Sequence, residues 1–367
     1  MKVPFFDYPR LYLDDKKMLT EVFDDVCSRG AFIMQQDLSE FEANFKNFTK
    51  SKFSIGVANG TDALELALLA IGLEKGDEVI ICSHTMIATA SAIVTAGGVP
   101  IPVELGYDNL IDPSAIESAI TSKTVGIMPT QLNGRTCDMD KIQTIAEKHG
   151  LFIVEDSAQA LGSKFKDKFA GTFGAAGTIS FFPAKVLGCL GDAGGVLTQD
   201  KDLYHKIYQL HDHGRDVDGE IKSWGRNSRM DNLQAAVLNK KLKNYGSVIE
   251  RRREIASMYN ERLNSIDELS LPIAPDAEAD HFDVFQNYEI RAKNRDGLKQ
   301  FLEENQIGTL IQWSGKAVHQ WESLSFNINL PETELFFKEC IMIPMNIFLS
   351  NSQIDYICET ITKFYRK

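Results

Sequence analysis

The stretch Thr178 to Gly195, TISFFPAKVLGCLGDAGG, holds a lysine in a setting that favours nucleophilic chemistry. An apolar strand, Ile179 to Phe182, is interrupted by Pro183, and Lys185 follows just before a glycine-rich run. A lysine attacks a carbonyl only as the free amine, and apolar neighbours lower its pKa because they disfavour the ammonium form. Lys185 is therefore a candidate nucleophile, whereas a lysine taken at random is most often a solvated surface residue.

A second stretch upstream, LFIVEDSAQALG, supplies a matching acid. The apolar run Leu151 to Val154 predicts a buried parallel strand, which delivers Glu155 and Asp156 at its carboxyl end. Open α/β sheets bind their ligands at that end of the strands. We expect this strand to bring Asp156 to the site of chemistry.

A lysine and an aspartate are the two protein groups that pyridoxal 5'-phosphate (PLP) needs. The lysine carries the cofactor as a Schiff base and then shuttles a proton. The aspartate keeps the ring nitrogen protonated, so that the ring accepts electrons from a substrate carbanion. Lys185 and Asp156 together predict a PLP enzyme, and no GxGxxG run opens a helix as a nicotinamide-dependent oxidoreductase would require.

The segment Val57 to Leu69, VANGTDALELALL, predicts a strand that meets a largely apolar helix at Gly60 and Thr61. The free amides and positive dipole end of such a helix bind anions. A well-capped buried helix would select the same residue types. Ser180, beside the candidate lysine, favours a binding site for the cofactor phosphate over capping alone.

With these motifs in view, the chain resembles the nucleotide-sugar aminotransferases of the DegT/StrS type, within the fold-type I PLP enzymes of the aspartate aminotransferase superfamily. The resemblance runs over nearly the whole chain, from VANGTDALELAL through VEDSAQALG and SFFPAKVLG to NSRMDNLQAAVL. It implies that Lys185 forms the Schiff base, Asp156 pairs with the pyridine nitrogen and Gln159 reaches the phenolic oxygen. It also implies that Ser180 binds the phosphate and that Asn227 reaches the phosphate of the partner subunit.

The resemblance is looser around the substrate. The family usually places a ring-stacking aromatic residue where this chain has Met86; a thioether can cover a ring face, and His84 is the other candidate. Arg229 matches a residue near the bound substrate. His319, in WSGKAVHQW, matches a histidine that faces the substrate pocket, but the surrounding tyrosine and leucine are absent. A hydrogen-bonded structural histidine is the alternative.

The implied reaction moves an amino group from an amino acid, L-glutamate, to a keto-deoxy-sugar carried on a nucleotide, for lipopolysaccharide, capsule or related amino-sugar biosynthesis. Some members carry histidine in place of the lysine and are dehydratases, so Lys185 favours transamination. The alternatives are a PLP aminotransferase or dehydratase acting on another phosphorylated ketone, and a non-catalytic regulator that binds cofactor or sugar.

Composition limits the other classes. The net charge of −12 and pI of 5.2 argue against affinity for nucleic acid or an anionic membrane surface. No stretch approaches the ~20 apolar residues of a membrane span, so we expect a cytoplasmic protein. Six cysteines without metal-type spacing predict reduced thiols and no metal site. Cys189 lies near the candidate lysine but has no histidine nearby in sequence to activate it.

Alternating strands and helices with short connections predict an α/β fold, a mainly parallel sheet flanked by helices. We expect a large PLP-binding domain, residues 1–245 with an N-terminal helical segment, and a small C-terminal α+β domain, residues 246–367. A strand is expected at Thr309 to Trp313, and a long helix from Asp231 is expected to bend near Gly246. The role implied for Asn227 requires a homodimer with shared sites.

Overall fold

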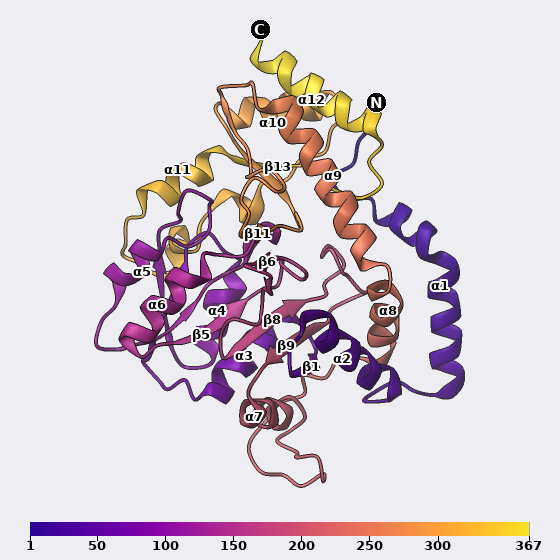
Figure 1. The fold of residues 1–367 in the computed structure, drawn as a ribbon, viewed down its shortest axis with the longest axis vertical. Helices are drawn as coiled ribbons and strands as arrows, with labels where there is room; N and C mark the ends of the chain where they lie inside the picture. Colours follow the sequence, from indigo (N-terminus) through magenta and orange to yellow (C-terminus); the bar gives the residue numbers. More distant parts are fainter. Residues whose placement is uncertain (367) are drawn as a thin grey trace.

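A computed structural model describes residues 1–366 and is built around a seven-stranded sheet (Figure 1). The spatial order of its strands is β1-β9-β8-β5-β4-β2-β3. The strands are β1 (Phe53–Val57), β2 (Glu78–Cys82), β3 (Val99–Val103), β4 (Thr124–Met128), β5 (Phe152–Asp156), β8 (Ala176–Ser180) and β9 (Gly194–Thr198).

The sheet is mainly parallel, as the sequence predicts. The four neighbouring pairs from β3 to β8 run parallel, whereas β9 is antiparallel to both β8 and β1. The carboxyl ends of β2, β4, β5 and β8 therefore meet at one edge, with β5 near the middle of the sheet. Ligands of open α/β sheets bind at this edge.

Helices cover both faces of the sheet, which explains why its strands are apolar on both sides. In β2, Val79 and Ile81 pack on one face with α3 (Gly60–Ile71), α4 (Ile87–Thr95) and α7 (Lys201–His211). Ile80 points to the other face, where α5 (Pro113–Ala119) and α6 (Met139–His149) pack. All three side chains are fully buried. The predicted α/β class is confirmed.

Three helices close the other end of the sheet, over β8 and β9. Phe41 and Phe45 of α2 (Gln36–Thr49) pack edge to face against Phe181. The same core includes residues from α8 (Asn232–Leu242) and the start of α9 (Tyr245–Leu263). Helix α1 (Tyr8–Arg29) lies outside α8, along the right side of Figure 1.

The C-terminal part has its own core. A three-stranded sheet, ordered β10-β12-β13, packs with α9, α10 (Arg295–Glu304) and α12 (Asn351–Tyr365). Its strands are β10 (Leu269–Ser270), β12 (Tyr288–Ala292) and β13 (Cys340–Ile343), and α11 (Pro331–Glu339) precedes β13. Helix α9 joins two cores: Ile249 belongs to the core that α2 and α8 form over β8 and β9, and Tyr259 belongs to the C-terminal core. The division at residues 245 and 246 stays our proposal, and it falls at the start of this helix.

Two local predictions are wrong. Residues 309–313 do not form a strand: only Leu310 makes an isolated bridge, to Met342, and Gln312–Gly315 is a 3-10 turn in which Trp313 and Ser314 have positive φ. The helix from residue 231 is not one bent helix but two, α8 and α9, interrupted before Tyr245, so Gly246 lies inside α9.

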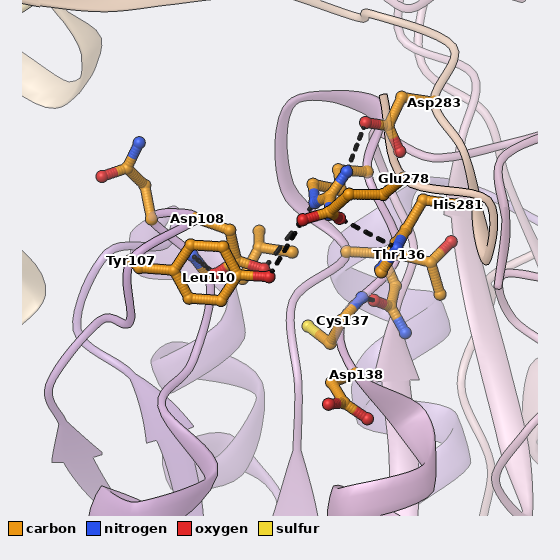
Figure 2. Close-up of polar contacts among 12 residues, drawn as sticks. Tyr107, Asp108, Leu110, Thr136, Cys137, Asp138, Glu278, His281 and Asp283 are labelled. Atoms are coloured by element: carbon orange, nitrogen blue, oxygen red, sulfur yellow. Dashed lines mark hydrogen bonds and ion pairs between the residues drawn. The ribbon is translucent and has the colours of Figure 1, made fainter. Parts of the chain in front are cut away.

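A buried ionic cluster joins the sheet domain to the chain that follows α9. Arg135 donates to Asp283 at 2.6 Å and to Glu278, and Asp108 lies 3.7 Å from its Nε. Tyr107 donates its hydroxyl to Glu278 at 3.3 Å. Figure 2 shows the Tyr107 ring and Asp108 on one side of this cluster and Asp283 on the other, with Glu278 between them. A small three-stranded sheet lies beside the cluster: β6 (Lys164–Phe165), β7 (Lys168–Phe169) and β11 (His281–Phe282).

Within residues 1–366, no helix is long and apolar enough to cross a bilayer, and no group of three or more His, Cys, Asp or Glu side chains is arranged to hold a metal ion. The six cysteines are all free thiols. Burial raises the pKa of Cys189 to about 11. An activated thiol has a lowered pKa, so Cys189 does not have the properties of a nucleophile.

Candidate active site

A cavity of about 520 Å3 lies at the carboxyl edge of the large sheet. Seven residues singled out in the sequence line it, and they come from the starts of α3 and α4, the last residues of β5 and β8, and the segments that follow these two strands. They are Gly60, Thr61, Met86, Asp156, Gln159, Ser180 and Lys185.

Lys185 lies in a tight turn after β8. Its backbone N–H donates to the Phe182 carbonyl at 2.8 Å. The turn closes on Gly188, where a Cβ would lie 2.7 Å from the Pro183 carbonyl oxygen, so only glycine fits there. Burial lowers the pKa of Lys185 to about 8, and the charge of Asp156 partly opposes this shift. At pH 7 roughly a tenth of the amine is therefore unprotonated, far more than at the ordinary pKa of 10.5.

Asp156 ends β5 and is almost fully buried. Its Oδ2 accepts a hydrogen bond of 2.6 Å from the hydroxyl of Thr89, and its Oδ1 accepts one of 3.2 Å from the Ala158 N–H. Burial raises the pKa of Asp156, and the Thr89 bond, the Ala158 bond and the charge of Lys185 oppose that rise. The two donors hold the carboxylate in one orientation.

The hydroxyl that orients Asp156 is itself held in place. Thr89 and Thr130 both lie within hydrogen-bond distance of the Thr85 hydroxyl, at 2.7 and 2.8 Å. All three threonines are buried. This chain of hydroxyls connects the carboxyl ends of β2 and β4 to the aspartate on β5.

The side-chain amide of Gln159 is oriented by the neighbouring loop. Its Oε1 accepts from the backbone N–H of Asn133 at 3.0 Å and from the side chain of Asn287 at 3.4 Å. Because both contacts use the oxygen, the Nε2 donor is left for a ligand in the cavity. The residue therefore presents a hydrogen-bond donor rather than an acceptor.

The N-terminus of α3 faces Ser180 across a very short gap. A Cβ added to Gly60 would lie 2.9 Å from the Ser180 Cβ, so glycine permits this approach. The Asn59 side chain caps the helix by accepting from the Asp62 N–H at 2.8 Å. The earlier amides, of Gly60 and Thr61, precede the helical hydrogen bonds and point out of the helix. Together with the hydroxyls of Thr61 and Ser180, these amides form a set of hydrogen-bond donors suited to an anion.

Met86 occupies the N-cap of α4 and is 48% exposed at the wall of the cavity. His84, the other candidate for ring stacking, does not line the cavity. Its Nδ1 lies 2.8 Å from the Asn109 carbonyl and its Nε2 lies 3.4 Å from Glu289, and its ring packs against Phe336 with centroids 4.3 Å apart. The structure thus brings Met86, and not His84, to the cavity.

His319 also lies outside the cavity. It is buried, its Nδ1 lies 2.7 Å from the Ser83 hydroxyl, and its Nε2 lies 3.4 Å from Glu334. These contacts match those of a hydrogen-bonded structural histidine, the alternative left open by the sequence.

Asn227 and Arg229 belong to a loop on the outside of the chain. Arg229 donates its Nε to the Asn227 side chain at 3.0 Å and pairs with Asp212 at 3.0 Å. Between them, the buried Ser228 donates to Asp62 at 2.6 Å, which fixes the loop against the first turn of α3. Neither residue lines the cavity of its own chain.

Sequence reasoning missed three groups that hold the site together. Thr89 follows Thr85 at helical spacing just after β2, and this spacing was a usable signal. Asn133 and Gln286 gave no such signal, because their contacts join segments that are far apart in the sequence: Asn133 to Gln159, and Gln286 to Ala184 and Val186.

Comparison with known proteins agrees with this geometry. Residues 13–362 match the model of the DegT/DnrJ/EryC1/StrS aminotransferase family. A relative from Geobacillus stearothermophilus, named pleiotropic regulatory protein, is 37% identical, with 100% of this chain and 99% of that protein aligned.

Two further comparisons concern Streptomyces venezuelae. Its dTDP-3-amino-3,4,6-trideoxy-alpha-D-glucose transaminase is 33% identical, with 99% of this chain and 96% of that protein aligned. The crystal structure of DesV in complex with a ketimine intermediate superimposes with a TM-score of 0.95 at 32% identity, and covers 100% of this chain and 99% of the other.

Proposed function

Because the chain belongs to the DegT/DnrJ/EryC1/StrS aminotransferase family, whose members depend on PLP, we propose that it transfers the amino group of L-glutamate to a keto-deoxy-sugar carried on a nucleotide. The relative that acts on a dTDP-sugar supports the nucleotide-linked substrate. One observation carries the proposal: an amine of lowered pKa and a buried carboxylate line the same cavity.

The residues of the cavity fit the cofactor. The close approach of Gly60 to Ser180 leaves a cradle of amides and hydroxyls for a phosphate, and Asp156 offers a fixed carboxylate to a ring nitrogen. When bound, PLP supplies an electron sink for the carbanion formed at the substrate Cα. The group that remains to be provided by the chain is a base for the Cα proton.

Lys185 provides that base in the proposed mechanism. Its Nζ would hold the cofactor when PLP is bound. As a free amine, the same Nζ would take the Cα proton of the amino acid and hold it for return. A pKa near 8 suits this exchange, because a catalytic base works best with a pKa close to the working pH.

Asp156 and Gln159 would orient the cofactor ring. The Asp156 carboxylate, which Thr89 holds in place, would keep a proton on the ring nitrogen. Gln159 would donate its free Nε2 hydrogen to the phenolic oxygen, because its Oε1 already accepts from Asn133. Met86, at the cavity wall, has a thioether that could cover a face of the ring.

The functional unit in this proposal is a homodimer. The loop that carries Asn227 is fixed at its base by Ser228 and leaves Asn227 exposed. Trp224, in the same loop, is 97% exposed, and Val217 and Ile221 are exposed as well. A second copy would cover these apolar side chains and receive Asn227 at its cofactor phosphate, with Arg229 beside the substrate.

The half-reaction with glutamate tests the function. Purified protein loaded with PLP should lose the near-visible absorption of the lysine-bound cofactor when L-glutamate is added, and should recover it with a suitable nucleotide-linked ketosugar. A regulator, as the name of one relative suggests for that protein, would bind PLP without this change. A dehydratase would consume the sugar without glutamate. We place the reaction in the cytoplasm, in amino-sugar synthesis for surface polysaccharides.

A further inference from the structure

Gln286 holds the backbone on both sides of Lys185. Its Nε2 donates to the carbonyl of Ala184 at 2.8 Å, and its Oε1 accepts from the N–H of Val186 at 2.8 Å. One side-chain amide therefore pairs with both residues that flank the lysine. Since an N–H cannot accept and a carbonyl cannot donate, these contacts also fix which way the amide faces.

The Gln286 side chain with its two hydrogen bonds, which we call the clamp, is buried and anchored. Gln286 is only 6% exposed, so water does not compete strongly for its two bonds. The guanidinium of Arg252, on α9, donates to the carbonyls of Phe285 at 3.0 Å and of Gln286 itself at 3.1 Å. The backbone from which the clamp extends is thereby fixed to a helix.

A second anchor comes from the loop that orients Gln159. The Val284 N–H donates to the Gly134 carbonyl at 2.8 Å. Gly134 has a φ of +91°, and a Cβ there would lie 2.6 Å from the backbone nitrogen of Gln286. The neighbouring Asn287 donates to the side chain of Asn133 at 2.8 Å. Residues 284–287 therefore contact the segments of both Lys185 and Gln159.

The clamp matters because it supplies the hydrogen bonds of the backbone groups on either side of Lys185. Within the turn, the Lys185 N–H bonds to Phe182, but the carbonyl of Ala184 and the N–H of Val186 are satisfied by Gln286. Without it, both half-buried backbone groups would lose their partner, at a cost that a local rearrangement of the turn would relieve. Such a rearrangement would move the Cα of the lysine.

We propose that Gln286 is a positioning residue for Lys185, which holds the amine at the geometry needed for attack on the cofactor and for proton transfer. The inference rests on the proposed role of Lys185. It makes the segment between α9 and β12 part of the catalytic apparatus, although no side chain of that segment has to react.

The test compares Gln286→Met with Gln234→Met in the full-length protein. Gln234, on α8, accepts from the Leu190 N–H at 2.9 Å, so it makes the same kind of bond to the same loop, five residues beyond Lys185. Gln286→Glu is the second variant: it keeps the acceptor for Val186 but removes the donor to Ala184. Folding of each variant is checked by its thermal transition.

The first readout is independent of activity. Deuterium exchange of the peptide that contains Val186, in cofactor-free protein, should become about tenfold faster in Gln286→Met and should be unchanged in Gln234→Met, because only the first variant frees that amide. The second readout is the rate at which Lys185 reacts with added PLP. It should fall about tenfold in Gln286→Met and less in Gln286→Glu, since small misplacements of a reacting group cost this much or more.

The inference would be overturned if both Gln286 variants kept the wild-type exchange and reaction rates. It would also be overturned if Gln234→Met changed both rates as much as Gln286→Met does. Failure of the proposed function looks different. In that case the wild-type protein itself would not react with PLP through Lys185, whereas the exchange difference between the two glutamine variants would still report on the clamp.

Discussion

The hydroxyl of Thr89 donates to the carboxylate of Asp156 at 2.6 Å, and both side chains are buried. This bond stabilises the ionised form of an acid whose pKa burial would otherwise raise further. In Thr89→Val the volume is kept and the bond is lost. We expect kcat for transamination to fall about tenfold, as for the loss of one hydrogen bond to a charged group. Thr89→Ser, which restores a donor, should recover most of the rate.

Asp156→Asn removes the charge that keeps the cofactor ring nitrogen protonated. The variant should still bind PLP through Lys185 but should lose roughly 100-fold or more in the glutamate half-reaction, because a fixed charge at the reacting centre is lost. Stopped-flow absorbance after glutamate addition measures this. A variant with near wild-type rates would remove Asp156 from the mechanism.

The lowered pKa of Lys185 predicts a pH dependence. The reaction of cofactor-free enzyme with PLP needs the free amine, so its rate should rise with pH and level off above a midpoint of about 8, rather than near the ordinary value of 10.5. Because the charge of Asp156 raises the pKa of Lys185, Asp156→Asn should move the midpoint to lower pH. A midpoint near 10 in the wild type would contradict the burial of this amine.

The same shift affects stability. Since folding lowers this pKa, the unfolded chain binds the proton more tightly, and the contribution of Lys185 to the free energy of unfolding should rise with pH between about 8 and 10.5. Lys185→Met should lose this pH dependence, which a comparison of urea unfolding midpoints across that range would detect.

Gly60→Ala tests the phosphate cradle. The added Cβ would approach the Ser180 Cβ to 2.9 Å and push the helix start away from the strand end. We expect the dissociation constant for PLP to rise about tenfold, since the anion contacts depend on this approach. Gly246→Ala is the matched control, because a Cβ there meets nothing within 4 Å. Equal cofactor affinity in the two variants would argue against a phosphate at this position.

The sequence predicts regular, amphipathic elements well. Helices α6 (Met139–His149) and α7 (Lys201–His211) are examples, because apolar periodicity and the N-cap residues Asp138 and Asp200 mark them locally. The parallel sheet follows from the alternation of strands and helices along the chain. The residues that line the cavity could be predicted because they lie in short motifs at strand ends.

The features of the fold and the site that the sequence does not predict depend on contacts between distant segments. Strand β13 escaped prediction because its partner, β12, precedes it by some fifty residues, and residues 309–313 lack the pairing that a strand there would need. His84 and His319 resemble site residues in sequence, but packing against Phe336 and pairing with Ser83 place them in the interior. Gln286 is recognisable only once the turn at Lys185 is in place.

The most direct test of the central claim follows the absorption of PLP-loaded protein on addition of L-glutamate, for wild type and Lys185→Arg side by side. We predict that the near-visible band of the wild type disappears with glutamate, and that Lys185→Arg, with an unchanged thermal transition, neither shows this band nor reacts. A wild-type spectrum that glutamate leaves unchanged, or a Lys185→Arg protein that reacts as the wild type does, would contradict the account.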